Sequence, residues 1–182
     1  MKFSGQPVRR VVVIDENQKS KAIADGPSPD VRSDPARPGL ILSRLWVSDS
    51  TPVRTAGVRE SVTTLPHTLV PPPGGSVCRA VTFPPEGGGA RKVKVEAIEA
   101  WFESLGARGA WTGAGAAPHP YMQKTRSLEF ALVIEGEITL VLEAEEVRLS
   151  AGDTVVQRGT NHAWSNRSRA PCTVVFSTHD AR

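Results

Sequence analysis

The sequence predicts an all-β protein, a barrel or sandwich with an N-terminal β arm and one principal helix. Three features carry this prediction: many short apolar segments separated by turn residues, one segment with helical periodicity, and a hairpin-like pattern near the N-terminus. The chain has 182 residues, a length that favours a single domain with a sizeable core. We expect residues 1–75 to form the arm and loops, 76–117 a strand, a helix and a loop, and 118–182 the core of the domain.

The strands are predicted from short apolar runs bounded by Gly, Pro and polar clusters. Residues 9–14 and 21–24 flank the polar DENQ turn and resemble a hairpin. Residues 26–39, rich in Pro and Gly, are expected to be irregular. The remaining strands are expected at 41–47, 76–83, 128–134, 137–142, 146–149, 154–157, 162–165 and 173–177. From residue 128 onward, Glu135-Gly136, Ala151-Gly152-Asp153 and Arg158-Gly159 are predicted to be successive hairpin corners.

One segment has the period of a helix. In VEAIEAWFESL, residues 95–105, the apolar residues Ile98, Trp101, Phe102 and Leu105 recur at i, i+3, i+4 and i+7, and Gly106 follows as a stop signal. The apolar face is expected to close one end of the barrel. A lid over a pocket is the alternative.

Composition argues against several classes of protein. The formal charge of +3 is small and the basic residues are scattered, so we expect no nucleic-acid partner, and the basic stretch at 90–94 is assigned to a solvated helix border. No signal-peptide pattern or run of about 20 apolar residues occurs, which leads us to expect a cytoplasmic protein with no membrane partner. Cys78 and Cys172 are far apart without zinc-site spacing and are expected to be reduced core thiols.

Two motifs after Pro118 carry a family resemblance. Gly152, Gly159, His162 and Asn166 follow the order of the second cupin motif, although the gap between the glycines is one residue shorter than usual and Arg158 replaces the usual Pro. Glu129 and Gly136 fit the first motif at 129–136. The chain therefore resembles the cupin superfamily, which implies a double-stranded β-helix, the jelly-roll barrel.

More narrowly, three segments resemble a group of single-barrel cupins found in bacteria and in fungal biosynthetic clusters. They are PPPGGSVCRAVTFPPE, LEFALVIEGEITLVLE and VVQRGTNHAWSNRS, and the arm sequences RRVVVIDENQKSKAIADG and LWVSDSTP add to the likeness. Members commonly carry Met-His-x-Thr before the strand with the acidic residue. This chain has Met122-Gln123-Lys124-Thr125, so Gln123 occupies the place of the expected histidine.

Strand alternation then predicts a polar pocket. Side chains at i and i+2 share a face of a strand, so Gln123, Thr125 and Glu129 are expected to point the same way. By the same rule His162, Trp164 and Asn166 are expected to meet them from a facing strand, with Tyr121 nearby as a loop anchor or pocket acid.

The resemblance bears on metal binding as well. A catalytic metal in a cupin is usually held by three His and a carboxylate, whereas this set offers one imidazole and one carboxylate, with Gln123 as a weak third donor. We therefore expect no cofactor. The alternative is a divalent transition metal held by His162, Glu129 and Gln123.

Three functional classes follow. The first is a metal-independent lyase, isomerase, dehydratase or cyclase acting on a small carbonyl-containing metabolite, with Glu129 as the base, His162 as the acid or orienting donor, and Gln123 orienting an oxygen. The second is a metal-dependent dioxygenase or decarboxylase. The third is a non-catalytic ligand-binding or sensing barrel, in which His162 and Asn166 tie the last hairpin together and Glu129 pairs with Arg126 or Arg158.

The arm bears on assembly. It has β character but too little flanking core to stand alone, and cupin barrels often pair through sheet faces or exchanged strands. A homodimer with a small-molecule ligand is the expected state.

Overall fold

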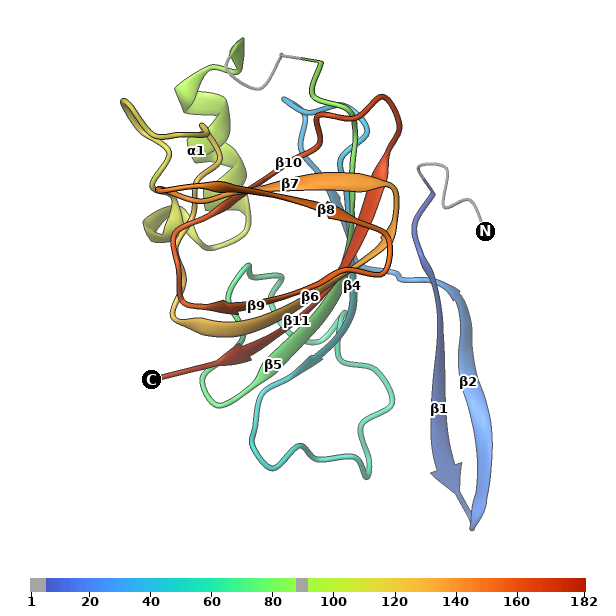
Figure 1. The fold of residues 1–182 in the computed structure, drawn as a ribbon. Helices are drawn as coiled ribbons and strands as arrows, with labels where there is room; N and C mark the ends of the chain where they lie inside the picture. Colours follow the sequence, from blue (N-terminus) through green and yellow to red (C-terminus); the bar gives the residue numbers. More distant parts are fainter. Residues whose placement is uncertain (1–5, 88–91) are drawn as a thin grey trace.

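Two antiparallel sheets face each other and enclose the core (Figure 1). The structure is a computed structural model, and it describes residues 6–87 and 92–182. The larger sheet has the order β3-β4-β5-β11-β6-β9, and the smaller one has the order β10-β7-β8. The prediction of an all-β jelly-roll barrel is confirmed.

The elements follow the predicted order closely. The N-terminal and first barrel strands are β1 (Arg9–Glu16), β2 (Lys19–Pro27), β3 (Val31–Ser33), β4 (Ile41–Ser48) and β5 (Ser76–Phe83). Helix α1 (Val95–Ser104) and the 3-10 turn η2 (Arg108–Ala110) come next. The remaining strands are β6 (Ser127–Glu135), β7 (Glu137–Val141), β8 (Glu146–Ser150), β9 (Thr154–Arg158), β10 (Ala163–Ser165) and β11 (Cys172–Asp180).

The segment expected to be irregular holds a short strand. β3 pairs with β4 through Val31↔Ser43 and Ser33↔Ile41, at the edge of the larger sheet. All three β3 side chains are exposed, so its sequence lacks the apolar alternation by which a half-buried strand is recognised. Residues 90 and 91 of the basic stretch at 90–94 lie outside the described residues.

The expectation of successive hairpin corners was wrong, because each predicted corner joins strands of different sheets: β6 to β7 at Gly136, β8 to β9 at Gly152 and β9 to β10 at Gly159. β7 and β8 form a hairpin, but β6 and β7 belong to different sheets, and β6 pairs with β9 and β11 instead. Gly136 lies at this crossing with a φ of +80°, and a Cβ there would lie 2.7 Å from the carbonyl oxygen of Pro171. The bend between the sheets therefore depends on a residue without a side chain.

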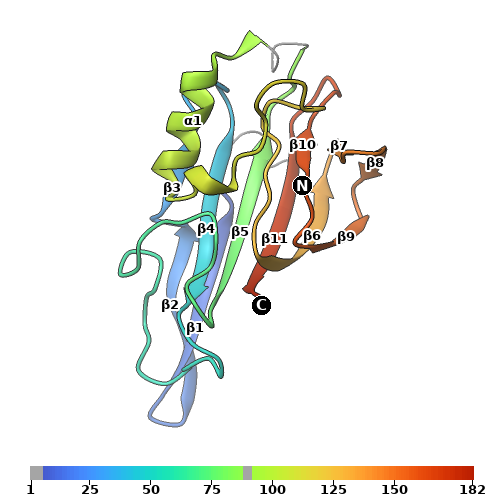
Figure 2. The same cartoon turned by 90° about the vertical axis from the view of Figure 1, so that its left-hand side faces the viewer.

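Helix α1 packs against one end of the barrel (Figure 2). Its side chains Ile98, Trp101 and Phe102 are buried, and Gly106 follows the helix with a φ of +57°. These residues join the main hydrophobic cluster with the inward side chains of β4, β5 and β11. The predicted apolar face is confirmed, and it faces the core.

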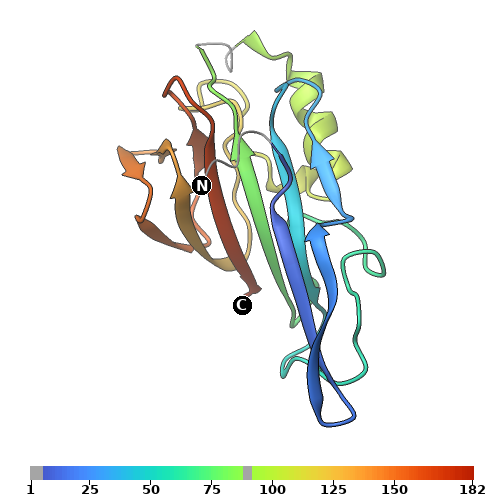
Figure 3. The same ribbon diagram turned by 90° about the vertical axis from the view of Figure 1, so that its right-hand side faces the viewer.

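The N-terminal arm is a two-stranded ribbon that projects beyond the barrel (Figures 1 and 3). β1 and β2 pair antiparallel, and Val11 and Val13 are exposed on the ribbon. Across residues 6–87 and 92–182, no helix combines the length and apolarity that crossing a bilayer requires.

Replacing Gly136 by Ala should destabilise the fold more than the same change at Gly152. Both glycines have positive φ, which costs an L-residue roughly 1–2 kcal/mol. Only Gly136 is crowded, because nothing lies within 4 Å of a Cβ built at Gly152. Overpacking adds about 1–3 kcal/mol, so Gly136→Ala should lose at least about 1 kcal/mol more in urea unfolding than Gly152→Ala. Equal losses would show that the sheet crossing tolerates a side chain.

Candidate functional site

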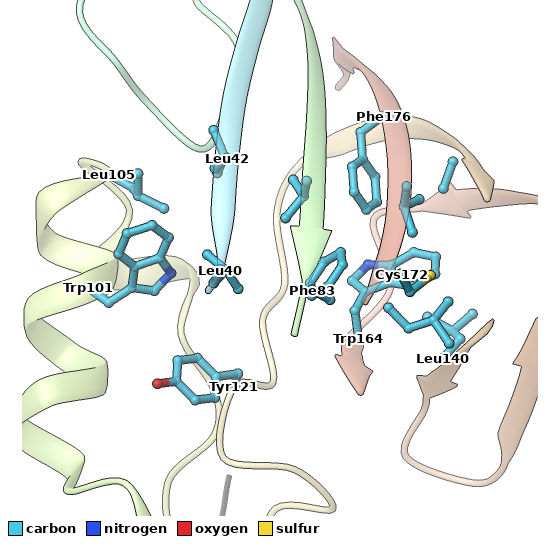
Figure 4. Packing of buried hydrophobic residues seen from close by; sticks show 14 of the residues in the cluster. Leu40, Leu42, Phe83, Trp101, Leu105, Tyr121, Leu140, Trp164, Cys172 and Phe176 are labelled. Atoms are coloured by element: carbon cyan, nitrogen blue, oxygen red, sulfur yellow. The ribbon is translucent and has the colours of Figure 1, made fainter. Parts of the chain in front are cut away.

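A small cavity of about 80 Å³ lies between the inner face of the larger sheet, α1 and β10. Its walls are mostly aliphatic and aromatic side chains from β4, β5, β11 and α1. Figure 4 shows Trp101 and Tyr121 on one side of this region and Trp164, Phe83 and Phe176 on the other. The polar groups among the lining residues are Arg37, Arg79, Tyr121, Gln123, Glu129 and Trp164.

Glu129 lines the cavity from β6. Its Oε2 accepts a hydrogen bond of 2.7 Å from Thr178 Oγ1, on the neighbouring strand β11. The ion pairs suggested by the sequence, with Arg126 or Arg158, do not occur in the described part of the chain. Glu129 is the one carboxylate among the described residues that line this cavity.

His162 lies next to Gln123 and is not among the residues that line the cavity. The two residues form an isolated antiparallel bridge, in which Gln123 N donates to His162 O at 2.8 Å and His162 N donates to Gln123 O at 3.0 Å. The side chains meet as well, with the two Nε2 atoms 3.4 Å apart. His162 Nδ1 donates to Thr160 O at 2.9 Å, so in the neutral ring Nε2 is an acceptor for the Gln123 amide.

This geometry corrects the expected pairing of His162 with Glu129. Gln123 lies at the cavity wall, and its side-chain amide donates to Nε2 of His162, because the backbone bridge holds these two residues opposite each other. His162 thus contacts Gln123, a residue of the cavity wall. Gln123 and Glu129 both line the cavity.

Trp164 forms part of the cavity wall from β10. Its ring makes edge contacts with His162, at a centroid distance of 6.2 Å, and with Phe176, at 5.3 Å. The side chain is 5% exposed, and the buried indole Nε1 has no hydrogen-bond partner among the residues described.

Two predicted pocket residues lie elsewhere. Thr125 bonds Ser127 Oγ at 2.7 Å and borders a hollow on the outer surface, because the loop before β6 turns away from the barrel. Asn166 is buried in the β10–β11 turn, where its Nδ2 donates to Phe83 O and Ala170 O and its Oδ1 accepts from Ser168. Asn166 therefore ties this turn to β5, as the structural alternative supposed.

Tyr121 is fixed by a charged cluster at the α1 end of the cavity. Its hydroxyl donates to Asp34 Oδ2 at 3.0 Å, and the guanidinium carbon of Arg37 lies 3.6 Å from the ring centroid. Arg37 also pairs with Asp34 at 2.8 Å. Burial raises the pKa of the Tyr121 phenol, and Asp34 adds to the rise although Arg37 opposes it. Tyr121 therefore stays protonated and acts as an anchor.

Arg79, like Arg37, is a charged cavity residue that the sequence analysis missed. It comes from β5 and is 3% exposed, and its Nη2 donates to Leu69 O at 2.6 Å. Burial lowers the pKa of its guanidinium, and the nearby Glu129 carboxylate opposes that change. The signal was present in SVCRAVTF, where the alternation places Arg79 on the same face as Val77 and Val81.

The side chains of two other histidines, His67 and His119, are also buried. His67 Nδ1 bonds Asp30 at 2.8 Å, and burial lowers the pKa of this imidazole while Asp30 opposes the change. His119 lies 3.3 Å from a carboxylate oxygen of Glu86. Burial by itself would raise the pKa of Glu86, but hydrogen bonds from His119 and Ser165 hold it below its usual value.

The donor set does not fit the metal site that the resemblance implied. No group of three or more His, Cys, Asp and Glu side chains suited to a metal occurs within residues 6–87 and 92–182. His162 Nε2 faces an amide nitrogen of Gln123, which has no lone pair to offer a cation.

Comparisons with known proteins place this chain beside proteins of fungal biosynthesis clusters. The sequence model of the cupin domain matches residues 112–178. Phomopsin biosynthesis cluster proteins C' and D of Diaporthe leptostromiformis are each 34% identical to the chain over 143 residues, which make up 75% of this chain and 59% of theirs. Oryzines biosynthesis cluster protein J of Aspergillus oryzae is 49% identical over 51 residues, 28% of either chain. The chain thus spans about 59% of the length of the first two relatives.

Solved structures with similar folds share little sequence with it. A cupin 2 conserved barrel domain protein from Salinispora arenicola is 13% identical, with a TM-score of 0.42 over 84% of this chain and 82% of that one. An ethanolamine utilization protein from Salmonella typhimurium is 10% identical, with a TM-score of 0.45 over 98% of this chain and 100% of that one.

The sequence match covers β6 to β11 and both motifs around Glu129 and His162, and the strands of this region lie in the two facing sheets described above. The chain thus carries a cupin domain at residues 112–178.

Proposed function

We propose that the protein binds a small carbonyl-containing metabolite in the barrel cavity and catalyses a metal-independent proton transfer on it. The observation that carries this proposal is the position of Glu129, a carboxylate set in the wall of an otherwise largely apolar and aromatic cavity. The cupin domain and the relatives named for two biosynthesis clusters fit a cupin that acts on a small molecule.

Glu129 is the proposed base. Thr178 holds Oε2, which leaves Oε1 to accept a proton from a carbon next to a carbonyl group. The C–H bond breaks, its electron pair moves onto the carbonyl oxygen, and the proton resides on Glu129. Return of that proton to a different carbon gives an isomerisation, whereas loss of a leaving group from the adjacent carbon gives a lyase or dehydratase reaction.

Gln123 is the proposed orienting group. Its amide lies at the cavity wall, where it can hydrogen-bond a ligand oxygen, and His162 fixes the position of that amide through the 3.4 Å contact and the backbone bridge. His162 enters the proposal as a positioning residue, and we assign no proton transfer to it.

A homodimer formed through the projecting arm stays a proposal as well.

Glu129→Gln should abolish most of the turnover while keeping ligand binding. The amide has the shape of the carboxylate but cannot accept the proton, and one acid–base group contributes about 10² to 10⁴ in rate. The assay is proton exchange or conversion of a panel of small enolisable ketones, aldehydes and hydroxy acids, followed by NMR. Glu145→Gln is the matched control, because this substitution makes the same chemical change at an exposed position.

Two results would contradict this proposal. The first is a Glu129→Gln variant that converts a confirmed substrate at the wild-type rate. The second is a wild-type protein that binds panel compounds and converts none of them, which would favour a sensing barrel.

The metal alternative is tested by restoring the family-typical residue. The wild-type protein should hold well under one equivalent of Fe, Mn, Zn, Ni or Cu, and Gln123→His should raise the affinity for Zn or Ni at least about tenfold, because it places a second imidazole beside His162. Elemental analysis and metal titration measure both quantities. Stoichiometric metal in the wild-type protein that disappears in His162→Ala would instead establish the metal-dependent class.

A further inference from the structure

Arg79 is a buried cation without an ionic partner at contact distance. Three arginines are buried in the described part of the chain: Arg10, Arg44 and Arg79. Arg10 pairs with Glu60, and Arg44 pairs with Asp30 at 2.5 Å. For Arg79 no carboxylate oxygen of a described residue lies within 4.0 Å of a guanidinium nitrogen.

In the described part of the chain, the guanidinium of Arg79 also lacks hydrogen-bond acceptors for some of its donors. Within the described residues, Arg44 donates to three backbone carbonyls, of Val62, Leu65 and Pro66, whereas Arg79 donates to Leu69 O alone. The buried Nε of Arg79 has no partner among the described residues. A guanidinium stays charged inside a protein, and burying it without an anion is costly, so the site favours an anionic partner.

Trp164 supplies a second unsatisfied donor at the same cavity. Its Nε1 is buried and unpartnered among residues 6–87 and 92–182, and an indole N–H can only donate. Arg79 and Trp164 both adjoin Phe176: Arg79 is opposite Phe176 in the β5–β11 register, and the Trp164 and Phe176 rings are 5.3 Å apart. The two free donors therefore flank one aromatic ring in one cavity wall.

We propose that the ligand of this cavity is a small organic carboxylate. Its carboxylate group binds the guanidinium of Arg79, with the indole N–H of Trp164 as a further donor, and its apolar or unsaturated body lies against Phe176 and the other rings of the wall. The mainly apolar lining favours an acid with an apolar body over a free phosphate, and the volume of about 80 Å³ favours a compact one. This assignment rests on the proposed function in one respect, namely that the cavity is the small-molecule site.

The carboxylate assignment also explains how Glu129 stays available. Glu129 influences the pKa of Arg79 through charge but makes its hydrogen bond with Thr178 instead. The ligand carboxylate therefore pairs with the guanidinium of Arg79. The Glu129 carboxylate is then free to act on the carbon chain of the ligand.

The test is an NMR titration of the whole protein with propionate, crotonate and benzoate, each beside its primary amide, and with inorganic phosphate. The chain has 4 tryptophans, so the indole N–H region is simple, and Trp164→Phe identifies the Trp164 signal by its loss. We expect at least one carboxylate to shift that signal saturably and to bind at least about tenfold more tightly than its amide, since a hydrogen bond between two charged groups is stronger than one to a neutral amide. Phosphate should bind more weakly than that carboxylate.

Variants distinguish binding by Arg79 from a general effect of positive charge. Arg79→Gln should weaken carboxylate binding at least about tenfold and remove the preference over the amide. Arg158→Gln, which removes a positive charge from the exposed surface, should leave both unchanged. If Arg79→Gln does not fold, Trp164→Phe serves instead, because it keeps an aromatic wall while removing the N–H donor, and it should weaken carboxylate binding several-fold.

The outcomes distinguish this inference from the proposed function. No binding of any of the three carboxylates, equal binding of acid and amide, or full binding by Arg79→Gln would each overturn the carboxylate assignment. Glu129→Gln should still bind the carboxylate, so a loss of turnover without a loss of binding in that variant supports both ideas. Carboxylate binding that depends on Arg79, with no contribution of Glu129 to turnover, would sustain the ligand class and remove the catalytic role.

Discussion

The buried positive charge of Arg79, which has no carboxylate at contact distance among the described residues, is the constraint on which the rest of the cavity depends. The alternation of β5 points Arg79 toward the interior with Val81 and Phe83, and among the described residues Arg79 donates one side-chain hydrogen bond, to the Leu69 carbonyl. Aromatic side chains surround this charge and lower the local polarity, which strengthens any interaction with an anion. An arrangement of this kind costs stability in the absence of a partner, and such sites are typical of binding pockets.

The two-sheet architecture places the other groups around that charge. β6 and β11 bring Glu129 and Thr178 to the same inner face as Arg79, and the crossing at Gly136 carries the chain to the smaller sheet, from which Trp164 reaches the cavity. The charged cluster of Asp34, Arg37 and Tyr121 lies at the end covered by α1. Packing and function thus share the same residues, because the cavity wall is also the main hydrophobic cluster.

Much of the fold could be predicted from the sequence, because local signals determine it. The period of residues 95–105 predicted α1, and the run SVCRAVTF predicted β5 with its observed bounds. Strand pairing was harder to predict from the sequence, because a turn such as Glu135-Gly136 has the same sequence pattern in a hairpin and in a crossing between sheets. For the site, alternation along β6 brought Glu129 to the cavity correctly, and Gln123 reaches the cavity as expected although it lies in an isolated bridge outside the strands. Alternation failed for Thr125, Asn166 and His162, since side chains in loops and isolated bridges do not follow the alternation of a continuous strand.

A crystal structure of the protein grown with the tightest-binding carboxylate of the titration tests the central claim most directly. The account predicts density for the acid inside the barrel, with a carboxylate oxygen within hydrogen-bond distance of the Arg79 guanidinium and the body of the ligand against Phe176 and Trp164. It would be contradicted by a cavity in which Arg79 forms a contact ion pair with Glu129 and the carboxylate binds outside the barrel.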